Sequence, residues 1–399
     1  MHTTTGQTIR RIRKSLGMTQ AELGALLHLT QPAVSQLEHD GPAVYDVRVL
    51  RRVAKALRVP IAVLVVESDE EADVQRRQFL RAGAFGVSIA TLSEKRTAAS
   101  ANVRLGQTDV DRIVGSVNQI HQLQLIAGGD RLCDVAANEV RYVERLLDSG
   151  TYSDEVGKAL TSAGAEMMTA AGWVHYDAGH WRAARRYYAD ASQAAAIAGD
   201  GIAAAHAWIN AGLLSYREGS RPKEGVQLAE AAQLAARRDG GPKLRALAAI
   251  REAEAYSVIG DRSAMIAAVN RAHRAYESTR GNDPDYLGHL PEARLSGLTG
   301  LAFTRLGDYQ EAAAYLRAAV SGAVQYPREQ AAWQIRLAEN MVQAGAIADG
   351  CAALLDNFDN ISTVASARLQ AALTGIADGL RPYASVSEAR EFLGLWTAG

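Results

Sequence analysis

The sequence predicts an all-α protein in which a small basic N-terminal domain precedes a long array of helical hairpins. Three observations predict this fold. Residues 19–38 contain the signals of two short helices that meet at a sharp corner. Apolar residues elsewhere recur at helical spacings, and no stretch shows the alternation of a strand. Beyond residue 109, five sets of small and aromatic residues recur at nearly fixed offsets.

Length and charge divide the chain into unlike parts. Its 399 residues exceed what one hydrophobic core usually serves, so we expect two or more units. The net charge is −1, but residues 1–64 carry nine Lys or Arg against four Asp or Glu. The remainder must then carry 34 positive and 40 negative charges. The small unit therefore suits a polyanionic partner, which the large unit would repel.

Several classes of protein are not expected. There is no run of 18 apolar residues for a membrane span, and the N-terminus lacks the apolar core of a secretory signal. Residues 75–81 imitate a twin-arginine export signal, but they follow a complete domain, so we expect a linker helix. Cys133 and Cys351 form no metal-type spacing and are expected to be inert thiols of a cytoplasmic protein.

The first helix of the small domain is expected from Thr8 to Leu16. Its Arg10 and Arg11 either contact phosphates or form an ordinary solvated face. The corner follows, where Thr19 is expected to cap the second helix and Glu22 completes a capping box. Thr30 opens the third helix, with a proline in its first turn. The inward faces of these two helices are expected to be Leu23, Leu26 and Leu27, and then Val34 and Leu37.

The third helix has an outward face without charge. It carries Gln31, Ala33, Ser35 and Gln36, where a surface helix normally carries ionised side chains. An amide can donate and accept hydrogen bonds at once, which suits a helix that enters a groove of DNA and reads base edges. The two helices therefore predict a helix-turn-helix motif.

This stretch, TQAELGALL…TQPAVSQLE, closely resembles the second and third helices of the Xre-type DNA-binding domain of phage repressors, and the resemblance extends over residues 6–64. It implies a five-helix domain that binds operator DNA as a dimer. By position, Gln20 would brace a phosphate and the recognition helix, while Gln31 and Gln36 would read bases. Arg13 and Glu38 would form a pair that ties the first helix to the third.

Two residues depart from the family pattern. Pro32 stands where several relatives have a second base-reading polar residue, so readout there is lost or replaced by apolar contact with a thymine methyl. His28 stands where a turn glycine is common, and histidine tolerates a positive φ at some strain. The candidate DNA-binding residues are Gln20, Thr30, Gln31, Pro32, Ser35, Gln36, Arg10 and Arg11.

Two further helices complete the small domain. Asp46 is expected to cap a helix over residues 47–57, and residues 60–66 form a short apolar fifth helix. We therefore expect a DNA-binding domain at 1–66 and a partly helical linker at 67–108. The rest, 109–399, should be a solenoid that binds an effector and dimerises.

The repeats of the solenoid are seen by counting from one residue. From Gly300, Phe303, Gly307, Tyr309, Ala312, Leu316 and Ala319 lie at +3, +7, +9, +12, +16 and +19. All six offsets recur from Gly172 and Ala253, four recur from Ala338, and three recur from Gly212. They resemble the tetratricopeptide (TPR) repeat, in which small residues lie where two helices cross. Helix pairs near 110–147 and 362–396 match poorly and are expected to be end caps or a dimer surface.

A solenoid of this kind has a concave groove lined by the first helix of each repeat. Asn210, Arg251 and Arg336 recur two residues before the crossing position. Asparagine can bind the backbone of an extended peptide, and arginine can bind a carboxylate through two N–H groups. A peptide or an acidic small molecule is expected there; the alternative is that these residues bond neighbouring repeats or face water. The candidate ligand-binding residues are Trp173, Tyr176, His206, Asn210, Tyr216, Arg251, Arg294, Arg336 and Glu339.

The sequence predicts neither a cofactor nor a metal site. His121, His175, His180 and His206 show no pairing at metal spacing and are expected in the core or on the surface. No Ser/His/Asp or Cys/His set can be assembled from local motifs, so an enzyme is not expected.

Together these features predict a dimeric transcription regulator with a palindromic operator, whose half-sites lie about one helical turn apart. The arrangement is similar to the peptide-responsive Xre–TPR regulators of bacterial quorum sensing. An alternative is a DNA-localised scaffold whose solenoid binds a protein partner constitutively. Effector-dependent DNA affinity would separate the two functions.

Overall fold

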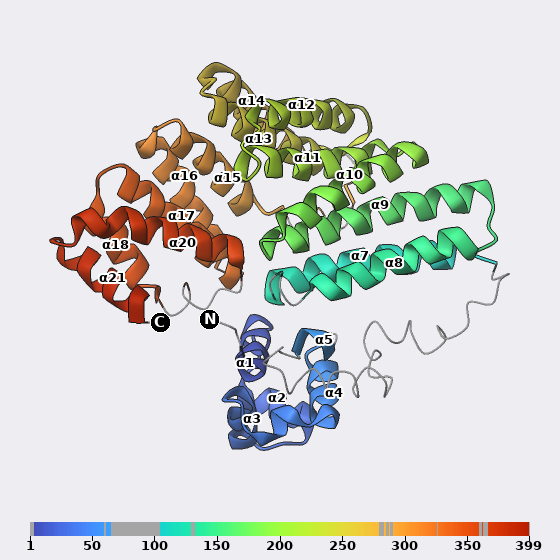
Figure 1. Cartoon of the computed structure of the whole chain (residues 1–399), viewed down its shortest axis with the longest axis horizontal. Helices are drawn as coiled ribbons and strands as arrows, with labels where there is room; N and C mark the ends of the chain where they lie inside the picture. Colours follow the sequence, from blue (N-terminus) through green and yellow to red (C-terminus); the bar gives the residue numbers. More distant parts are fainter. Residues whose placement is uncertain are drawn as a thin grey trace.

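The computed structural model describes residues 4–59, 61–64, 104–127, 129, 132–278, 283–284, 287, 290–324, 326–358, 361 and 366–398. Within these ranges nearly every residue is helical or in a turn between helices (Figure 1). Their one β-type contact is an isolated bridge between Arg104 and Thr151. The prediction of an all-α fold is confirmed. Most of the expected linker, including the segment 75–81, lies outside the described residues.

The small domain contains the five predicted helices. Thr19 accepts from the backbone N–H of Glu22, whose carboxylate accepts from the N–H of Thr19, so the predicted capping box is present. The predicted caps Thr30 and Asp46 are also present. The helices are α1 (Thr5–Ser15), α2 (Gln20–Leu27), α3 (Gln31–Glu38), α4 (Val47–Ala56) and α5 (Ile61–Leu64), with a 3₁₀ turn at Pro42–Tyr45.

Two details of the small domain were predicted wrongly. Helix α1 begins three residues early, because Thr4 caps it with its own capping box. The buried face of α2 consists of Leu23, Gly24 and Leu27, while Leu26 is 55% exposed. A Cβ on Gly24 would lie 2.7 Å from the carbonyl oxygen of Leu29, so only glycine lets the chain return this closely. The buried face of α2 therefore includes Gly24 in place of Leu26.

The corner between α2 and α3 follows the prediction, because His28 ends α2 in the left-handed conformation, with φ at 52°. Leu16, the last residue of the expected first helix, is the C-cap of α1 and is 39% exposed.

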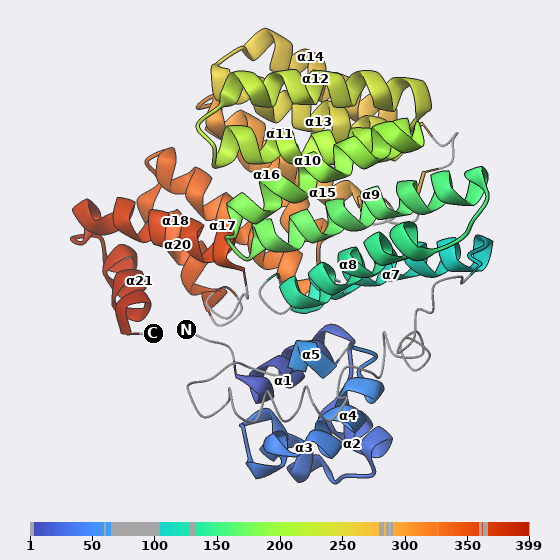
Figure 2. The ribbon, with the colours of Figure 1, turned by 45° about the vertical axis from the view of Figure 1, so that its right-hand side comes forward.

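The rest of the described chain forms paired helices stacked side by side (Figure 2). The five predicted repeats correspond to five hairpins, which confirms an α-solenoid after the small domain. They are α9 (Asp154–Asp177) with α10 (Trp181–Ala198), α11 (Gly201–Arg217) with α12 (Pro222–Asp239), α13 (Pro242–Ile259) with α14 (Arg262–Tyr276), α15 (Glu292–Arg305) with α16 (Tyr309–Gly322), and α17 (Pro327–Gln343) with α18 (Ile347–Leu355). The end pairs are α7 (Gln107–Ala127) with α8 (Cys133–Ser149), and α20 (Ala367–Leu380) with α21 (Ser387–Ala398).

The recurring offsets have a direct steric cause. A Cβ on Gly300 would lie 2.6 Å from Cγ of Leu316, and one on Gly172 would lie 2.4 Å from the ring of Tyr188. Each of these large residues is 16 positions after its glycine, so it fills the space that the small residue leaves. The glycine at offset +7 has a positive φ in four of the five hairpins, at Gly179, Gly260, Gly307 and Gly345. After α11 the positive φ of 50° falls on Ser220 instead of Gly219.

The solenoid curls until its two ends meet (Figures 1 and 2). Helix α20 contacts α9, and α17 contacts α7. Asp177 joins the ends: its carboxylate pairs with Arg328 and accepts from Ser366 Oγ (2.8 Å) and from the N–H of Gly129 (3.2 Å). The end pairs were predicted as caps or a dimer surface, but parts of them face each other inside the molecule. Dimerisation stays a prediction.

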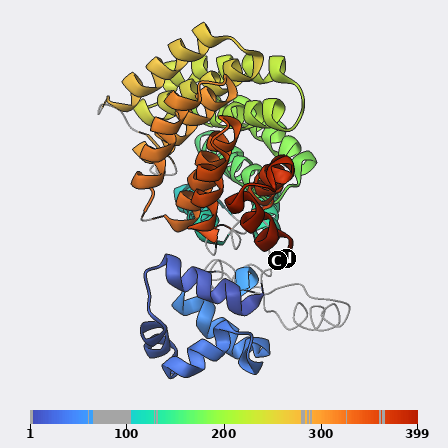
Figure 3. The ribbon, with the colours of Figure 1, turned by 90° about the vertical axis from the view of Figure 1, so that its left-hand side faces the viewer.

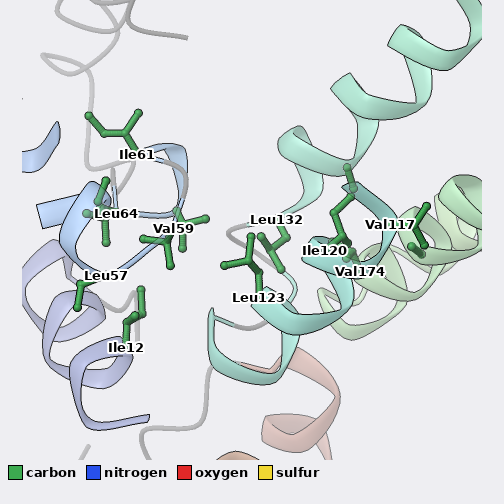
Figure 4. Close-up of a cluster of buried hydrophobic side chains, with 14 of the residues drawn as sticks. Ile12, Leu57, Val59, Ile61, Leu64, Val117, Ile120, Leu123, Leu132 and Val174 are labelled. Carbon is green, nitrogen blue, oxygen red and sulfur yellow. The ribbon is translucent and has the colours of Figure 1, made fainter. Parts of the chain in front are cut away.

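The small domain packs against the first end pair of the solenoid, mainly through α1 and α7 (Figure 3). Val59 and Leu57 belong to one apolar cluster with Leu123 and Leu132 (Figure 4). Helix α3 lies on the opposite side of the small domain from the solenoid (Figures 1 and 2). No helix in the described ranges has both the length and the apolar character that crossing a membrane requires.

Candidate nucleic-acid interface and ligand groove

Helix α3 presents the uncharged surface that the sequence predicts. Thr30, Gln31, Pro32 and Gln36 are exposed, and Ser35 is partly buried. On the opposite side of the helix, Val34 and Leu37 are buried in the core. The N-terminal half of α3 is thus free to enter a groove of a nucleic acid.

A buried hydrogen-bond network fixes α3 in this position. Arg13 on α1 pairs with both carboxylate oxygens of Glu38, at 3.0 Å for Nη2 and Oε2, and also donates to the carbonyl of Met18. Nε2 of Gln20 donates to Oε2 of Glu38 at 2.8 Å, and Oε1 of Gln20 accepts from Nε2 of Gln31. The network therefore runs from α1 through the C-terminal end of α3 to its exposed first turn.

The charge state of this network follows from its contacts. Arg13 and Glu38 are 6% and 2% exposed. Burial alone would raise the pKa of Glu38, but the hydrogen bonds from Arg13 and Gln20 outweigh it and lower that pKa below its usual value. Glu38 is consequently ionised at neutral pH and keeps the buried guanidinium of Arg13 neutralised.

The family comparison concerns this same region. A family model described as Helix-turn-helix matches residues 9–64, which run from within α1 to the end of α5. Residues 9–64 form an Xre-family helix-turn-helix domain. A search of curated proteins found no match to the chain.

The Xre-family domain has all its basic side chains except Arg58 on α1 and α4. Arg10 is exposed, and it lies close enough to Glu38 to act on its charge, which places it toward the end of α3. Arg11 is partly buried. Whether these arginines contact phosphates stays a prediction, and Arg10 is the more exposed of the two. Further exposed cations are Lys14, Arg48, Arg52 and Lys55.

The curled solenoid encloses a groove on its concave side, lined by both charged and apolar side chains. It contains a cavity of about 150 Å³, and an open depression of about 460 Å³ adjoins it and shares Arg217 and Arg336 in its wall. The cavity brings together six of the nine predicted ligand-binding residues: Trp173, His206, Asn210, Arg251, Arg294 and Arg336. Tyr216 lines the depression.

Two predicted residues lie outside both walls. The ring of Tyr176 is 1% exposed and packs inside the helical layers, and its hydroxyl donates to Glu218 at 3.2 Å. Glu339 pairs with Arg336 at 2.7 Å beside the groove.

The prediction missed the other wall residues, among them Arg217, Trp333, Arg328 and Arg368. The last two enter the wall because the solenoid closes, which no local repeat offset reveals.

A buried carboxylate, that of Glu254, pairs with several arginines of the groove. Glu254, 0% exposed, pairs with Arg217 and Arg251, and accepts from Arg305 (3.0 Å) and from Tyr216 Oη (3.1 Å). Burial would raise the pKa of Glu254, but the three guanidinium groups outweigh it and hold that pKa well below its usual range.

Asp177 is the corresponding acid at the closure of the solenoid. It is 1% exposed, and Arg328 and Arg368 lower its pKa against the effect of burial. Burial nonetheless lowers the pKa of Arg368 to about 10 despite the nearby Asp177.

The described part of the groove wall contains buried hydrogen-bond donors that have no partner. Five buried nitrogens in it have no hydrogen-bond partner among the described residues: Nε of Arg217, Arg251, Arg328 and Arg368, and Nε1 of Trp333. Buried donors normally have partners, and leaving one unpaired costs about 1–3 kcal/mol. An excess of donors and positive charge in one wall fits a ligand that carries carboxylate or phosphate oxygens.

Proposed function

We propose that this chain is a sequence-specific, dimeric transcription regulator whose solenoid binds an anionic effector and thereby controls operator binding. The Xre-family domain supports a DNA-binding regulator. The observation that carries the proposal is the exposed, uncharged face of α3, held in place by the buried network of Arg13, Glu38 and Gln20.

The chemistry of base reading follows from that network. Because Nε2 of Gln31 donates to Gln20, its Oε1 and second N–H remain for a base. Gln36 lies one helical turn and a half further along and is exposed without charge. A glutamine can donate to and accept from one adenine in the major groove. Thr30, Pro32 and Ser35 complete the surface, and Gln20 and Arg10 position the DNA backbone, with Arg11 beside them.

Residues 1–66 would bind DNA, 67–108 would join the two units, and 109–399 would bind the effector and dimerise. The dimer would bind a palindromic operator with half-sites about one helical turn apart. Because it would bind genomic DNA, the protein would act in the cytoplasm.

Gln36→Ala tests base reading. The full chain is first used to select a preferred duplex from random DNA, and affinities are then measured for that duplex and for a random competitor. We expect Gln36→Ala to weaken binding to the preferred duplex by about 1–3 kcal/mol and to leave random DNA unchanged. Gln310→Ala, at an exposed position on α16, is the matched control and should change neither. Equal losses on both duplexes would show that Gln36 does not read bases.

The proposal of an anionic effector rests on the hydrogen-bond donors of the groove wall that have no partner among the described residues. Inorganic phosphate and a short acidic peptide serve as probes, titrated at constant ionic strength while heat of binding is recorded. Arg336→Gln should weaken binding of the better probe several-fold, because Arg336 borders both the cavity and the depression. The matched control is Arg262→Gln, which removes an exposed arginine paired with Asp308 on another part of the solenoid and should have no effect. Equal binding by both variants would contradict the groove assignment.

The scaffold function predicts a different result. A constitutive scaffold would bind its operator with one affinity, whether or not a culture extract or a groove ligand is present. A regulator of the proposed kind changes its operator affinity when the effector binds, since the two sites must be coupled. The same affinity measurement, repeated with each addition, therefore distinguishes the two functions.

A further inference from the structure

Three side chains of metal-binding type meet outside the ligand groove, where α8 begins beside the turn from α9 to α10. Cys133 is the first residue of α8, His175 lies in the last turn of α9, and His180 directly precedes α10. One ligand atom from each lies within 4.8 Å of both others, and this is the one such group among the described residues. The sequence had predicted an inert thiol and unpaired histidines here.

The geometry is close to that of a bound transition metal. In a tetrahedral zinc site, bonds of about 2.0 Å to nitrogen and 2.3 Å to sulfur place neighbouring ligand atoms roughly 3.3–3.6 Å apart. Sγ of Cys133 and Nδ1 of His180 are 3.7 Å apart. The widest separation in the group, at most 4.8 Å, needs only a small side-chain rotation to reach the tetrahedral value.

The surroundings of His175 orient its ring as metal sites require. Nδ1 of His175 lies 2.9 Å from the carbonyl oxygen of Ala171, so this nitrogen carries the proton and donates it. Nε2 is then the nitrogen with a free lone pair. A ligating histidine typically donates its other N–H to a carbonyl in this way, which fixes both the tautomer and the ring orientation. The ring of Tyr187 packs against His175 with centroids 5.0 Å apart and limits its rotation further.

We propose that Cys133, His175 and His180 form a binding site for a borderline-soft divalent metal ion, with Zn²⁺ as the best match. One thiolate and two imidazoles are ligands that Zn²⁺ prefers, whereas Mg²⁺ and Ca²⁺ prefer oxygen ligands. Because His180 is exposed, the fourth coordination position is open to solvent. It is filled by water or by the carboxylate of Asp134, which follows Cys133 and acts electrostatically on His175.

The site lies next to the surface on which the DNA-binding domain rests. Leu132 directly precedes Cys133 and belongs to the apolar cluster shared with Val59 of the small domain (Figure 4). The bound ion would link the start of α8 to the end of α9 and the start of α10. It would thereby hold Leu132, which belongs to the apolar cluster shared with the small domain, against the hairpin of α9 and α10.

Co²⁺ is the probe for this site, because a cobalt–thiolate bond has an ultraviolet charge-transfer band and tetrahedral Co²⁺ has strong visible bands. The full chain, freed of metal with a chelator and kept reduced, is titrated with Co²⁺ and then with Zn²⁺. We expect both bands to saturate at one Co²⁺ per chain and to disappear as Zn²⁺ displaces it. We also expect Zn²⁺ to raise the melting temperature of the chain.

Variants identify the ligands. The chain has two cysteines, so Cys351→Ala, which changes a buried thiol in another core, is the matched control for Cys133→Ser. We expect Cys133→Ser to abolish the charge-transfer band, His180→Ala to weaken Co²⁺ binding at least tenfold, and Cys351→Ala to leave the titration unchanged. Circular dichroism of the exposed-site variant His180→Ala should match that of the natural chain. No charge-transfer band in the natural chain, or a band that persists in Cys133→Ser, would overturn the proposal.

Discussion

Replacing Glu38 with alanine should destabilise the DNA-binding domain strongly. Glu38 is the acid at which α1, α2 and α3 meet, since it accepts hydrogen bonds from both Arg13 and Gln20. Without its carboxylate, the guanidinium of Arg13, 6% exposed, loses its counter-charge inside the domain. Removing one partner of a buried ion pair typically costs about 3–5 kcal/mol. That is a large part of the 5–15 kcal/mol that stabilises an ordinary domain.

The pH dependence gives a second signature of the same pair. The folded domain lowers the pKa of Glu38, so the pair contributes stability above the unfolded value of about 4.3. That stability is lost as the pH falls from there through the lower pKa of the folded state. The variant lacks this contribution at every pH, so the stability difference between the two proteins should shrink on acidification below that value.

Hydrogen exchange of the amides in α1 and α3 is the suitable assay, because it reports the opening of this domain separately from the solenoid. We expect faster exchange in Glu38→Ala at neutral pH. The control is Glu22→Gln, which changes an exposed acid on α2 but keeps a side chain able to complete the capping box, and should leave exchange unchanged. Similar exchange rates in Glu38→Ala and the natural chain would refute the reasoning that the pair is buried and stabilising.

Two other predictions concern the solenoid. Gly300→Ala should lower the free energy of unfolding by about 1–3 kcal/mol, because the new methyl group would overlap Leu316. Gly375→Ala, in an exposed open stretch of α20, should raise it by roughly 0.5–1 kcal/mol. Urea unfolding followed by circular dichroism measures both changes, and equal effects would contradict the explanation that Gly300 lies at a helix crossing. Glu254→Gln should destabilise the solenoid at neutral pH but progressively less below the usual glutamate pKa. The folded state lowers the pKa of Glu254, and protonation at low pH removes from the natural chain the same charge that the variant lacks. A stability difference between the variant and the natural chain that persists unchanged at low pH would contradict the pairing with the three arginines.

Local signals predicted most of the architecture. Capping residues such as Thr19, Thr30 and Asp46 set the helix starts, because each satisfies backbone N–H groups within its own turn. The repeat offsets likewise predicted the five hairpins, since a glycine such as Gly300 and its partner Leu316 are close in the sequence as well as in space.

Features that depend on distant contacts were missed. Arg328 and Arg368 enter the groove wall only because both pair with Asp177, more than 150 residues earlier in the chain. Cys133 reaches His175 and His180 only because α8 packs against α9. Tyr176 is buried outside both walls, because a position can face inward along the repeat and still be covered by neighbouring helices.

The sequence preference of the intact protein tests the account most directly. The full chain is incubated with random duplexes, the bound fraction is sequenced over several rounds, and affinities of the enriched and unselected DNA are compared at one salt concentration. The account predicts enrichment of a two-fold symmetric motif that binds at least about 10³ times more tightly than unselected DNA. Equal affinity for both pools would contradict the assignment of α3 as a base-reading helix.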